Sequence, residues 1–454
     1  MEVLQRTANR GSISTGYDID NSLKLEADDS QYIDDRHYTA GNRKKLTISF
    51  WFKRTELGQT QMPYEQSALQ ARIYLRSTDD LYITAYDNSG WTIITNRLFR
   101  DTSAWYHCVF QLDTTQSTAA DRMKLWINGQ QETSFSSASY PTQNADTFFN
   151  TNQSAKVGGG GAGLYFSGYM SEFFFIDDQA LQASDFGEYD SDSGIWIPKE
   201  YAGTFGGQSY YLEFKNASNL ADRSDGLSNG VSLSVQNITS ADQATDTPTN
   251  NGCTLNVLAS LEGSNDITEG ALVSTGKAGG GGNFNGTYGT IGIDPFNSSV
   301  DWYWEIETSI GTSGSDTDIG IGWIKESRIT SGSTAYNNVY ADGISRYSSQ
   351  TVNAAGDIWG VLLETGTTPV MKLYRNDGLI YTATHGSGGV SFDTLMFPYI
   401  TVKGTSVDAR LNFLNPASSF SIASGNTDPN GYGNFEFDPK GGYALCTKNL
   451  AEYG

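Results

Sequence analysis

Apolar and polar residues alternate with period two along much of the chain, the pattern of half-buried β-strands. Two such runs end in tight-turn residues: 123–127 leads into Asn128-Gly129, and 371–375 leads into Asn376-Asp377-Gly378. Asn-Gly and Asp-Gly between such runs predict hairpins, because a type I′ turn needs positive φ at both central residues. We therefore expect Gly129 and Gly378 to have positive φ, and the chain to contain two sheet domains.

Further apolar runs surround the first hairpin in a definite order. They are 46–53 (LTISFWFK), 105–113 (WYHCVFQLD), 156–158 (KVG), 166–176 (FSGYMSEFFFI) and 179–186 (QALQASDF). In this order they resemble the strands of a laminin-G-like (LamG), concanavalin-type jelly roll. The resemblance implies a β-sandwich in the first half of the chain.

The second hairpin has different neighbours. These are 302–306 (WYWEI), 319–323 (IGIGW), 356–361 (GDIWGV) and 411–413 (LNF). Their order is similar to that of a SPRY domain, and the resemblance implies a second, bent β-sandwich of a kind that usually serves as a binding module.

The composition agrees with an all-β chain, since Gly, Tyr, Thr, Ser and Asn are abundant and no long segment has helical periodicity. A chain of 454 residues can form two or three cores. We predict two antiparallel β-sandwiches, a LamG-like jelly roll followed by a SPRY-like sandwich, with short terminal arms. The predicted segments are an arm at 1–20, a jelly roll at 21–236, a polar linker at 237–252, a SPRY-like sandwich at 253–420 and a tail at 421–454.

Charge and segment hydropathy exclude several classes of partner. The formal net charge of −22 argues against nucleic acid, because a phosphate backbone is bound chiefly through Lys and Arg. No signal-peptide core opens the sequence and no apolar segment approaches the roughly 20 residues of a membrane span, so we expect cytosolic synthesis and no membrane insertion. The three cysteines, Cys108, Cys253 and Cys446, are odd in number and widely separated, which predicts free thiols.

Sequence motifs for catalysis are weak. Laminarinase-type enzymes of the concanavalin-like fold carry Glu-X-Asp-X-X-Glu, but here Glu436-Phe437-Asp438 is followed by Gly441 at the decisive position. The three histidines, His37, His107 and His385, pair with no residue at zinc spacing, and His107 is interpreted as a packed strand residue. We therefore predict no catalytic residue, no cofactor and no enzymatic activity.

Loop carboxylates are candidate calcium ligands. Asp79-Asp80, Asp177-Asp178 and the run 190–192 offer suitable oxygen ligands, yet adjacent acidic residues in loops usually serve turn formation. We predict no metal site.

Aromatic residues in polar segments are the candidate ligand-binding groups. Tyr86 and Trp91 flank the expected turn at 87–90. A second set lies in one polar segment: Tyr336, Tyr340, Arg346 and Tyr347. Tyr among Ser, Asn and Gly provides rigid contact area with adaptable hydrogen bonding, and sugar rings stack on such side chains. For each ring, covering a sheet face is an equally good interpretation.

The whole arrangement resembles structural proteins of tailed phages, especially marine ones. The segments that carry this resemblance are 3–8 (VLQRTA), 17–23 (YDIDNSL), 246–251 (DTPTNN) and 442–447 (GYALCT). It implies a bacteriophage virion protein, made in the host cytoplasm and incorporated as a tail-fibre, tail-associated or capsid-associated component.

From this resemblance we expect a non-enzymatic appendage that recognises a host-surface glycan. One alternative is a capsid or tail adaptor or decoration protein without glycan binding, and a weaker one is a glycan-processing enzyme. The expected partners are other virion proteins and further copies of the chain. Apolar groups at 1–20 and 435–450, outside both predicted sandwiches, are the expected assembly segments.

Overall fold

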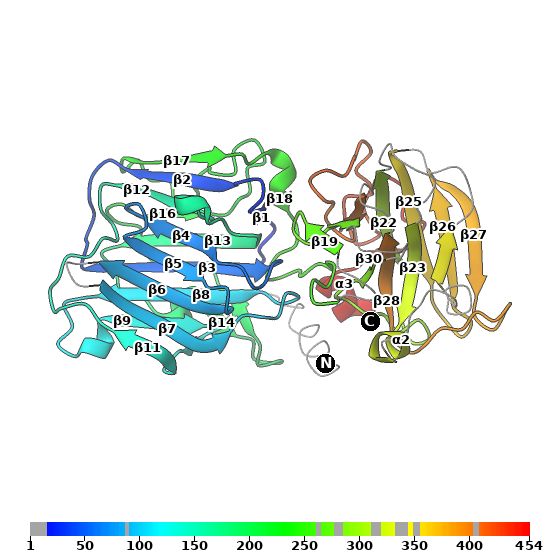
Figure 1. The fold of residues 1–454 in the computed structure, drawn as a ribbon, viewed down its shortest axis with the longest axis horizontal. Helices are drawn as coiled ribbons and strands as arrows, with labels where there is room; N and C mark the ends of the chain where they lie inside the picture. The colour runs from blue at the N-terminus through cyan, green and yellow to red at the C-terminus, as the bar shows by residue number, and fades with distance from the viewer. Residues whose placement is uncertain are drawn as a thin grey trace. The chain divides into compact units, whose positions relative to one another are not determined.

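The structure is a computed structural model that describes residues 16–86, 90–259, 265–276, 285–309, 319–331, 344–347, 355–402 and 408–454. Two compact units divide the described chain at Thr249 and Asn250, and we call them the N-terminal and the C-terminal unit (Figure 1). Both units consist mainly of antiparallel strands, which confirms the predicted all-β fold class. None of the helices among the described residues has the length and hydropathy that a membrane span requires.

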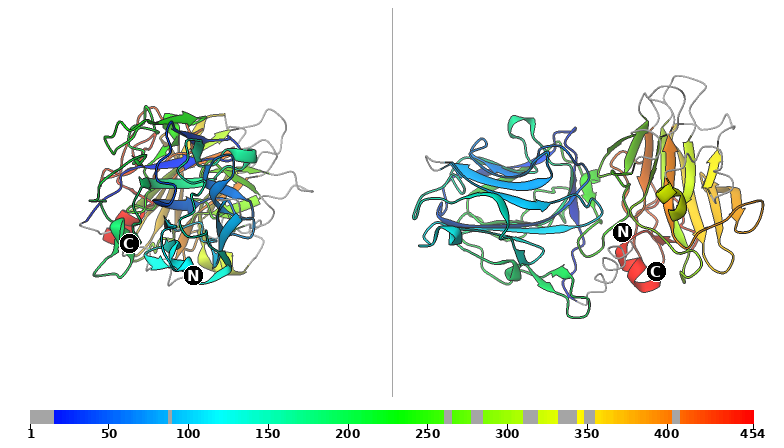
Figure 2. Two further views of the ribbon diagram at one scale, coloured as in Figure 1. Left: turned by 90° about the vertical axis from the view of Figure 1, so that its left-hand side faces the viewer. Right: turned by 60° about the horizontal axis from the view of Figure 1, so that its bottom comes forward.

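The N-terminal unit is a sandwich of two sheets, seen one above the other in the right-hand view of Figure 2. The first sheet has the order β10 (Gln130–Gln131), β9 (Met123–Ile127), β8 (Tyr106–Asp113), β3 (Lys45–Arg54), β13 (Gly168–Asp177), β1 (Ser22–Leu25), β18 (Gln243–Ala244), with β16 (Tyr210–Leu212) also paired to β13. The second has the order β11 (Phe135–Ser139), β7 (Gly90–Leu98), β6 (Asp80–Tyr86), β5 (Ala71–Leu75), β4 (Gln61–Gln66), β12 (Ser154–Val157), β2 (Tyr32–His37), β17 (Val231–Gln236). Short elements complete the unit: η1 (Ala119–Asp121), η2 (Gly161–Gly163), η3 (Ala183–Asp185), η4 (Ser240–Asp242) and the ribbon β14 (Gly187–Tyr189) with β15 (Trp196–Pro198).

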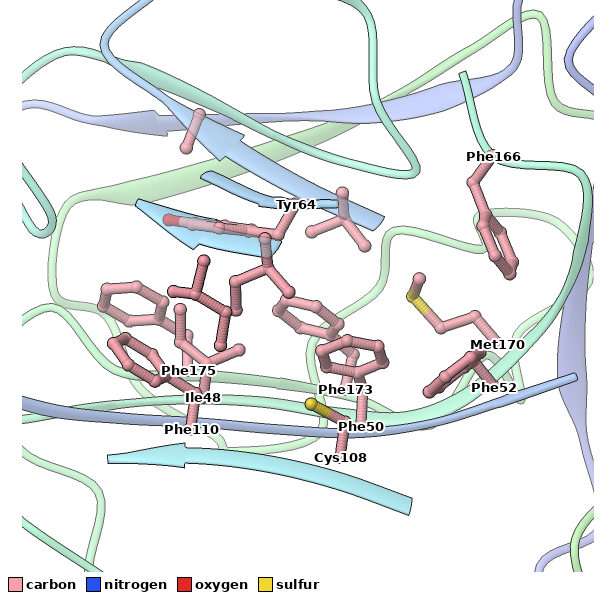
Figure 3. Close-up of a cluster of buried hydrophobic side chains, with 14 of the residues drawn as sticks. Ile48, Phe50, Phe52, Tyr64, Cys108, Phe110, Phe166, Met170, Phe173 and Phe175 are labelled. Carbon is pink, nitrogen blue, oxygen red and sulfur yellow. The ribbon is translucent and has the colours of Figure 1, made fainter. Parts of the chain in front are cut away.

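The space between these two sheets is filled by a mostly aromatic and aliphatic core. Phe50 of β3 and Phe173 of β13 stack at 5.6 Å between ring centroids, and Tyr64 of β4 meets Phe173 from the opposite sheet at 5.9 Å (Figure 3). Alternate residues of β3 and β8 point to this core, as the period-two pattern predicts. Burial of this apolar area is what holds the sandwich together.

The first predicted hairpin has the backbone conformation expected of its turn. Asn128 has φ +48° and Gly129 has φ +76°, so both central residues of the turn between β9 and β10 are left-handed. This confirms the predicted conformation of Gly129 and the type of turn.

The C-terminal unit is the second sandwich. One sheet has the order β19 (Asn265–Thr268), β20 (Val273–Gly276), β29 (Asp408–Asn412), β22 (Trp302–Ser309), β25 (Asp357–Glu364), β26 (Val370–Arg375), β27 (Gly378–Thr384), with β30 (Tyr443–Ala444) parallel to β22. The facing sheet has the order β21 (Asn285–Tyr288), β28 (Met396–Val402), β23 (Ile319–Lys325), β24 (Ile344–Tyr347). The described residues of this unit also form the short helices α2 (Glu326–Ser331) and α3 (Thr447–Tyr453).

The second hairpin turns one residue earlier than predicted. Asn376 (φ +46°) and Asp377 (φ +70°) are its central residues, while Gly378 pairs with Arg375 as the first residue of β27 and does not have positive φ. The prediction for Gly378 was therefore wrong. Asn and Asp tolerate the left-handed region because their short side chains can hydrogen-bond locally, so glycine is not needed here.

The predicted linker at 237–252 is instead packed structure up to Thr249. η4 and β18 lie within it, and β18 pairs with β1. The Asp246 carboxylate is buried and binds the Lys53 ammonium at 2.8 Å, which polar composition alone could not show. The hydroxyl of Thr249 accepts the Ile19 N–H at 3.0 Å, so residues from 16 onward also lie on the sandwich; residues 1–15 of the predicted arm lie outside the described residues.

The predicted tail at 421–454 is instead part of the C-terminal unit. Phe435, Leu445 and Cys446 are fully buried, and Leu450 of α3 reaches the main core. The apolar groups near the C-terminus are thus covered by their own unit rather than exposed for assembly, which corrects that part of the expectation for 435–450.

Carboxylates of β22 hold this segment in place. Glu305 accepts the backbone N–H groups of Glu436 at 2.9 Å and Phe437 at 2.8 Å. Its neighbour Glu307 accepts the N–H of Ser421 at 2.7 Å. Charged acceptors make strong hydrogen bonds to backbone N–H groups, so the segment is fixed at both ends of its path across the sheet.

All three cysteines are among the described residues, are buried, and form no disulfide. Burial raises the pKa of the Cys446 thiol to about 12. Each thiol is therefore a small buried hydrophobe, as predicted for Cys108.

Candidate functional site

A cleft of about 370 Å³ opens on the N-terminal unit, on the face of the first sheet that points away from the main core. Its described lining residues are Trp126, Gly129, Gln182, Ala183, Ser184, Gly187, Glu188, Tyr189, Trp196 and Lys199. We call it the aromatic cleft. Its volume is at the lower end of the range of small-molecule sites.

The alternation of side chains along β9 places Trp126 in this cleft. Its neighbours Leu125 and Ile127 point into the main core, so Trp126 faces the other side of β9, where it packs with Phe174 and Phe186. Only 7% of Trp126 is exposed, and it therefore forms floor rather than rim.

The second indole, Trp196, is seated between two glycines. A Cβ atom added to Gly129 would lie 2.2 Å from Trp196 Cε3, and one added to Gly187 would lie 2.5 Å from its Cζ2. Both glycines thus provide the space that the ring occupies, one from the β9–β10 turn and one from β14. Tyr189 approaches the same ring edge-on, with centroids 4.9 Å apart at 71°.

A buried histidine orients Trp196. The indole N–H of Trp196 donates to His107 Nδ1 at 3.0 Å, so this ring nitrogen is unprotonated and Nε2 carries the hydrogen that faces Ser49 Oγ at 2.9 Å. Trp51 stacks on the imidazole ring of His107, with 4.6 Å between ring centroids. Complete burial lowers the pKa of His107 to about 3, so it is neutral near pH 7. The interpretation of His107 as a packed, hydrogen-bonded residue is confirmed.

The rim of the aromatic cleft is polar and open to solvent. Tyr189 is 49% exposed and its hydroxyl donates to the Asn128 carbonyl at 3.3 Å. Gln182, Glu188 and Lys199 are exposed, and Lys199 Nζ donates to the Ser184 carbonyl at 3.2 Å. The site therefore combines aromatic surface with donors and acceptors of both charge signs, which suits a ligand that has apolar faces and many hydroxyl groups.

Of the predicted ligand-binding side chains, only that of Trp91 is described, and it does not line the aromatic cleft. Trp91 is 1% exposed and belongs to the main core, so it cannot contact an external ligand, which corrects that prediction. The alternation of β7 explains the burial, because Trp91 pairs with the core residue Ala85 of β6. Tyr336 and Tyr340 lie outside the described residues, as do the side chains of Tyr86, Arg346 and Tyr347.

Sequence reasoning missed Tyr189 and Trp196 because no motif connects them to Trp126. One signal is present in the sequence: Trp126 stands between the apolar residues Leu125 and Ile127 in a predicted strand, and because side chains alternate along a strand, it must point to the opposite face from them. Tyr189 and Trp196 follow Trp126 by 60–70 residues and belong to the separate β14–β15 ribbon, so they meet Trp126 only through side-chain packing in the folded unit.

The acidic pairs considered for calcium have protein partners. Asp79 binds Arg54 and Arg100, and Asp80 binds Arg76. Asp177 accepts N–H groups from Asn42 and other backbone and amide donors. Within the described chain, no group of three or more His, Cys, Asp or Glu side chains is placed to hold a metal ion.

We expect the Gly129→Val substitution to lower the free energy of unfolding of the N-terminal unit by roughly 1–3 kcal/mol, because valine is strained at φ +76° and its side chain would collide with Trp196. Gly378→Val is the matched control, since Gly378 lacks positive φ and its added Cβ meets only the Arg375 carbonyl at 3.4 Å. Urea unfolding, monitored by hydrogen exchange in each unit separately, would measure the free energy of unfolding of both variants. Equal losses for the two variants would contradict the assigned turns.

Comparison with known proteins agrees with the fold of the first unit. Residues 25–185 match the family model described as the concanavalin A-like lectin/glucanases superfamily. No curated protein sequence matches the chain.

Several solved structures are similar in part. The SAP-like pentraxin from Limulus polyphemus, a native heptamer, is 14% identical, covers 49% of this chain and 98% of its own, and has a TM-score of 0.31. Domains LG4-5 of the mouse laminin alpha1 chain are 10% identical, cover 91% and 95%, and have a TM-score of 0.30. The SPRY domain of human HERC1 is 10% identical, covers 35% and 96%, and has a TM-score of 0.25. The family match and the two-sheet topology agree that the N-terminal unit has a concanavalin-like jelly-roll fold.

Proposed function

We propose that this protein is a non-enzymatic component of a tailed-phage virion that binds a host-surface glycan in the aromatic cleft. The observation that carries the proposal is the grouping of Trp126, Tyr189 and Trp196 beside a polar rim on a lectin-like jelly roll. Sugars present flat C–H faces that stack on aromatic rings and hydroxyl groups that need donors and acceptors. Both requirements are met within one cleft.

The ring that a ligand would contact first is Tyr189, since it is the most exposed of the three aromatic rings. Trp196 packs edge-on against the Tyr189 ring, and its own indole N–H is fixed by the hydrogen bond to His107. This support fixes the rings before a ligand arrives, and such pre-organisation reduces the entropic cost of binding.

The non-enzymatic part of the proposal is supported by the acid content of the cleft. Glu188 is the one carboxylate among its described lining residues. Glycoside hydrolysis by the usual mechanism needs two carboxyl groups on either side of the scissile bond. A polysaccharide turnover assay tests this point, and product release that depends on Glu188 would contradict it.

Placement in a virion rests on the sequence resemblance to tailed-phage structural proteins. A small cleft is expected to bind weakly, and repetition on one particle can raise avidity by about 10²–10⁴. Imaging particles labelled with an antibody against this chain tests the location. Unlabelled particles would contradict a virion role and leave glycan binding to be judged by itself.

We expect Tyr189→Ala to weaken glycan binding about tenfold, because it removes an aromatic contact worth about 1.4 kcal/mol while leaving buried packing intact. Tyr38→Ala is the matched control, since Tyr38 is 64% exposed in the same unit but does not line the cleft. A glycan array would first identify the ligand, and titration of both variants would follow. An array without any bound glycan would favour the structural adaptor or decoration protein.

A further inference from the structure

The aromatic rings of the cleft do not share one plane. Tyr189 meets Trp196 with 71° between the two ring planes, and Trp126 forms the floor. The face of each ring carries partial negative charge and attracts cations, and the indole of tryptophan does so most strongly. Rings in different orientations can therefore contact a small cation from more than one side, in addition to stacking on an apolar sugar face.

Cations of the protein itself do not use these rings. Elsewhere in the same unit a cation lies over a tyrosine, as the Arg72 guanidinium does at 5.2 Å from the Tyr74 ring centroid. In the described chain, no lysine or arginine lies over a ring of the cleft. Lys199, which lines the cleft, instead donates to the Ser184 carbonyl. The ring faces are thus left for a cation that comes with a ligand.

The segment that carries Tyr189 and Trp196 is acidic. Residues 185–200 contain five carboxylates and one ammonium: Asp185, Glu188, Asp190, Asp192, Glu200 and Lys199. Glu188 is exposed and lines the cleft, and its carboxylate makes no hydrogen bond or ion pair within the part of the chain that the structure describes. The neutral His107, bonded to Trp196, adds no positive charge beneath that ring. Local negative charge raises the concentration of cations at a cleft.

We propose that the aromatic cleft binds the positively charged nitrogen of its glycan, so that the ligand is an amino sugar with a free ammonium group. This inference rests on the proposed glycan binding and adds the chemical class of the sugar. The ammonium lies against the ring faces and is attracted by Glu188, while the C–H face of the sugar stacks on Tyr189. An N-acetylated sugar has an uncharged nitrogen and loses both attractions to the cation.

Titration of the full chain with tetramers of glucosamine and of N-acetylglucosamine at pH 6 tests the proposal. The glucosamine tetramer should bind about fivefold more tightly, because only its nitrogens are charged. This preference should fall as the ionic strength rises, since salt screens the attraction. Equal or tighter binding of the acetylated tetramer would overturn the inference and leave glycan binding itself in place. Binding of neither tetramer would also overturn it, and the glycan array then decides the proposed function separately.

Variants at Tyr189 separate the attraction of the ring for a cation from simple apolar contact. Tyr189→Phe retains the ring face and should retain the preference for the charged tetramer. Tyr189→Leu retains an apolar side chain without a ring face, so the preference should fall to about twofold or less. A preference that Tyr189→Leu leaves at the wild-type value would contradict the role of the ring.

A substitution at Glu188 tests the contribution of the carboxylate. Glu188→Gln should weaken binding of the glucosamine tetramer about threefold and leave binding of the acetylated tetramer unchanged. Asp28→Asn is the matched control, because it removes one negative charge from an exposed turn between β1 and β2 that does not line the cleft. This variant should bind both tetramers as wild type does. Equal effects of Glu188→Gln and Asp28→Asn would show that Glu188 does not contact the ammonium.

Discussion

Replacing Asp246 with alanine should lower the free energy of unfolding of the N-terminal unit by about 3–5 kcal/mol, the usual cost of removing one partner of a buried ion pair. The Lys53 side chain is 0% exposed and that of Asp246 is 3% exposed, with 2.8 Å between Nζ and Oδ2. The same carboxylate accepts the indole N–H of Trp105 at 3.0 Å. The substitution would therefore leave a buried ammonium without its carboxylate and a buried indole without its acceptor.

A matched exposed pair provides the control. Asp146 lies 3.8 Å from Lys44, and their side chains are 58% and 39% exposed, so Asp146→Ala should cost less than about 1 kcal/mol. The Lys53→Met change added to Asp246→Ala should recover much of the loss, because it removes the buried charge. Urea unfolding, monitored by hydrogen exchange of peptides from the N-terminal unit, measures the free energy of unfolding of all three variants. Similar costs for Asp246→Ala and Asp146→Ala would contradict the assigned role.

Glu172→Gln should remove a pH dependence of the N-terminal unit. Burial raises the pKa of Glu172 to about 7, against the lowering effect of hydrogen bonds from Tyr211 at 2.7 Å and Tyr17 at 3.0 Å. A carboxyl whose pKa is higher in the folded state contributes stability below its ordinary pKa of 4.5, and this stability is lost as pH rises to about 7. The loss amounts to about 3 kcal/mol.

The difference in the free energy of unfolding between wild type and Glu172→Gln, measured as a function of pH, isolates the effect of Glu172, because the other carboxyls are common to both proteins. The variant should match wild type near pH 4.5 and be the more stable protein at pH 8, since the neutral amide can still bond to both tyrosine hydroxyls. Glu200→Gln serves as the control: Glu200 is an exposed carboxyl of the same unit that is not among the groups acting on Glu172, and its removal should leave the pH dependence of wild type. A flat difference curve would refute the assignment.

The strands were predictable because their signal is local. The run 46–53 alternates apolar and polar residues and forms most of β3, and the Asn128-Gly129 turn follows from backbone sterics at two residues. The second turn failed by one position because Asn, Asp and Gly all tolerate positive φ, so three adjacent candidates compete for two places. The pairing of Arg375 with Gly378 makes Asn376 and Asp377 the two central residues of the turn.

The roles of the polar segments were not predictable because they depend on distant partners. The sequence around Asp246 is typical of a linker, and only the fold shows that its carboxylate pairs with Lys53, which lies 193 positions away. The last 34 residues have the composition of a tail, and only the fold shows that the Glu305 carboxylate accepts the N–H groups of Glu436 and Phe437. The aromatic cleft was hidden for the same reason, since Trp196 meets His107 only through the fold.

The buried C-terminal segment also affects how the protein is made. Strand β1 needs β18, so the first sandwich can close once about 250 residues have left the ribosome, while the second is still being synthesised. The second sandwich must wait longer, because Leu445 and Leu450 belong to its core. A chain interrupted between 420 and 445 would carry one finished sandwich joined to one that still exposes apolar strands, which is the kind of intermediate that chaperones and proteases recognise.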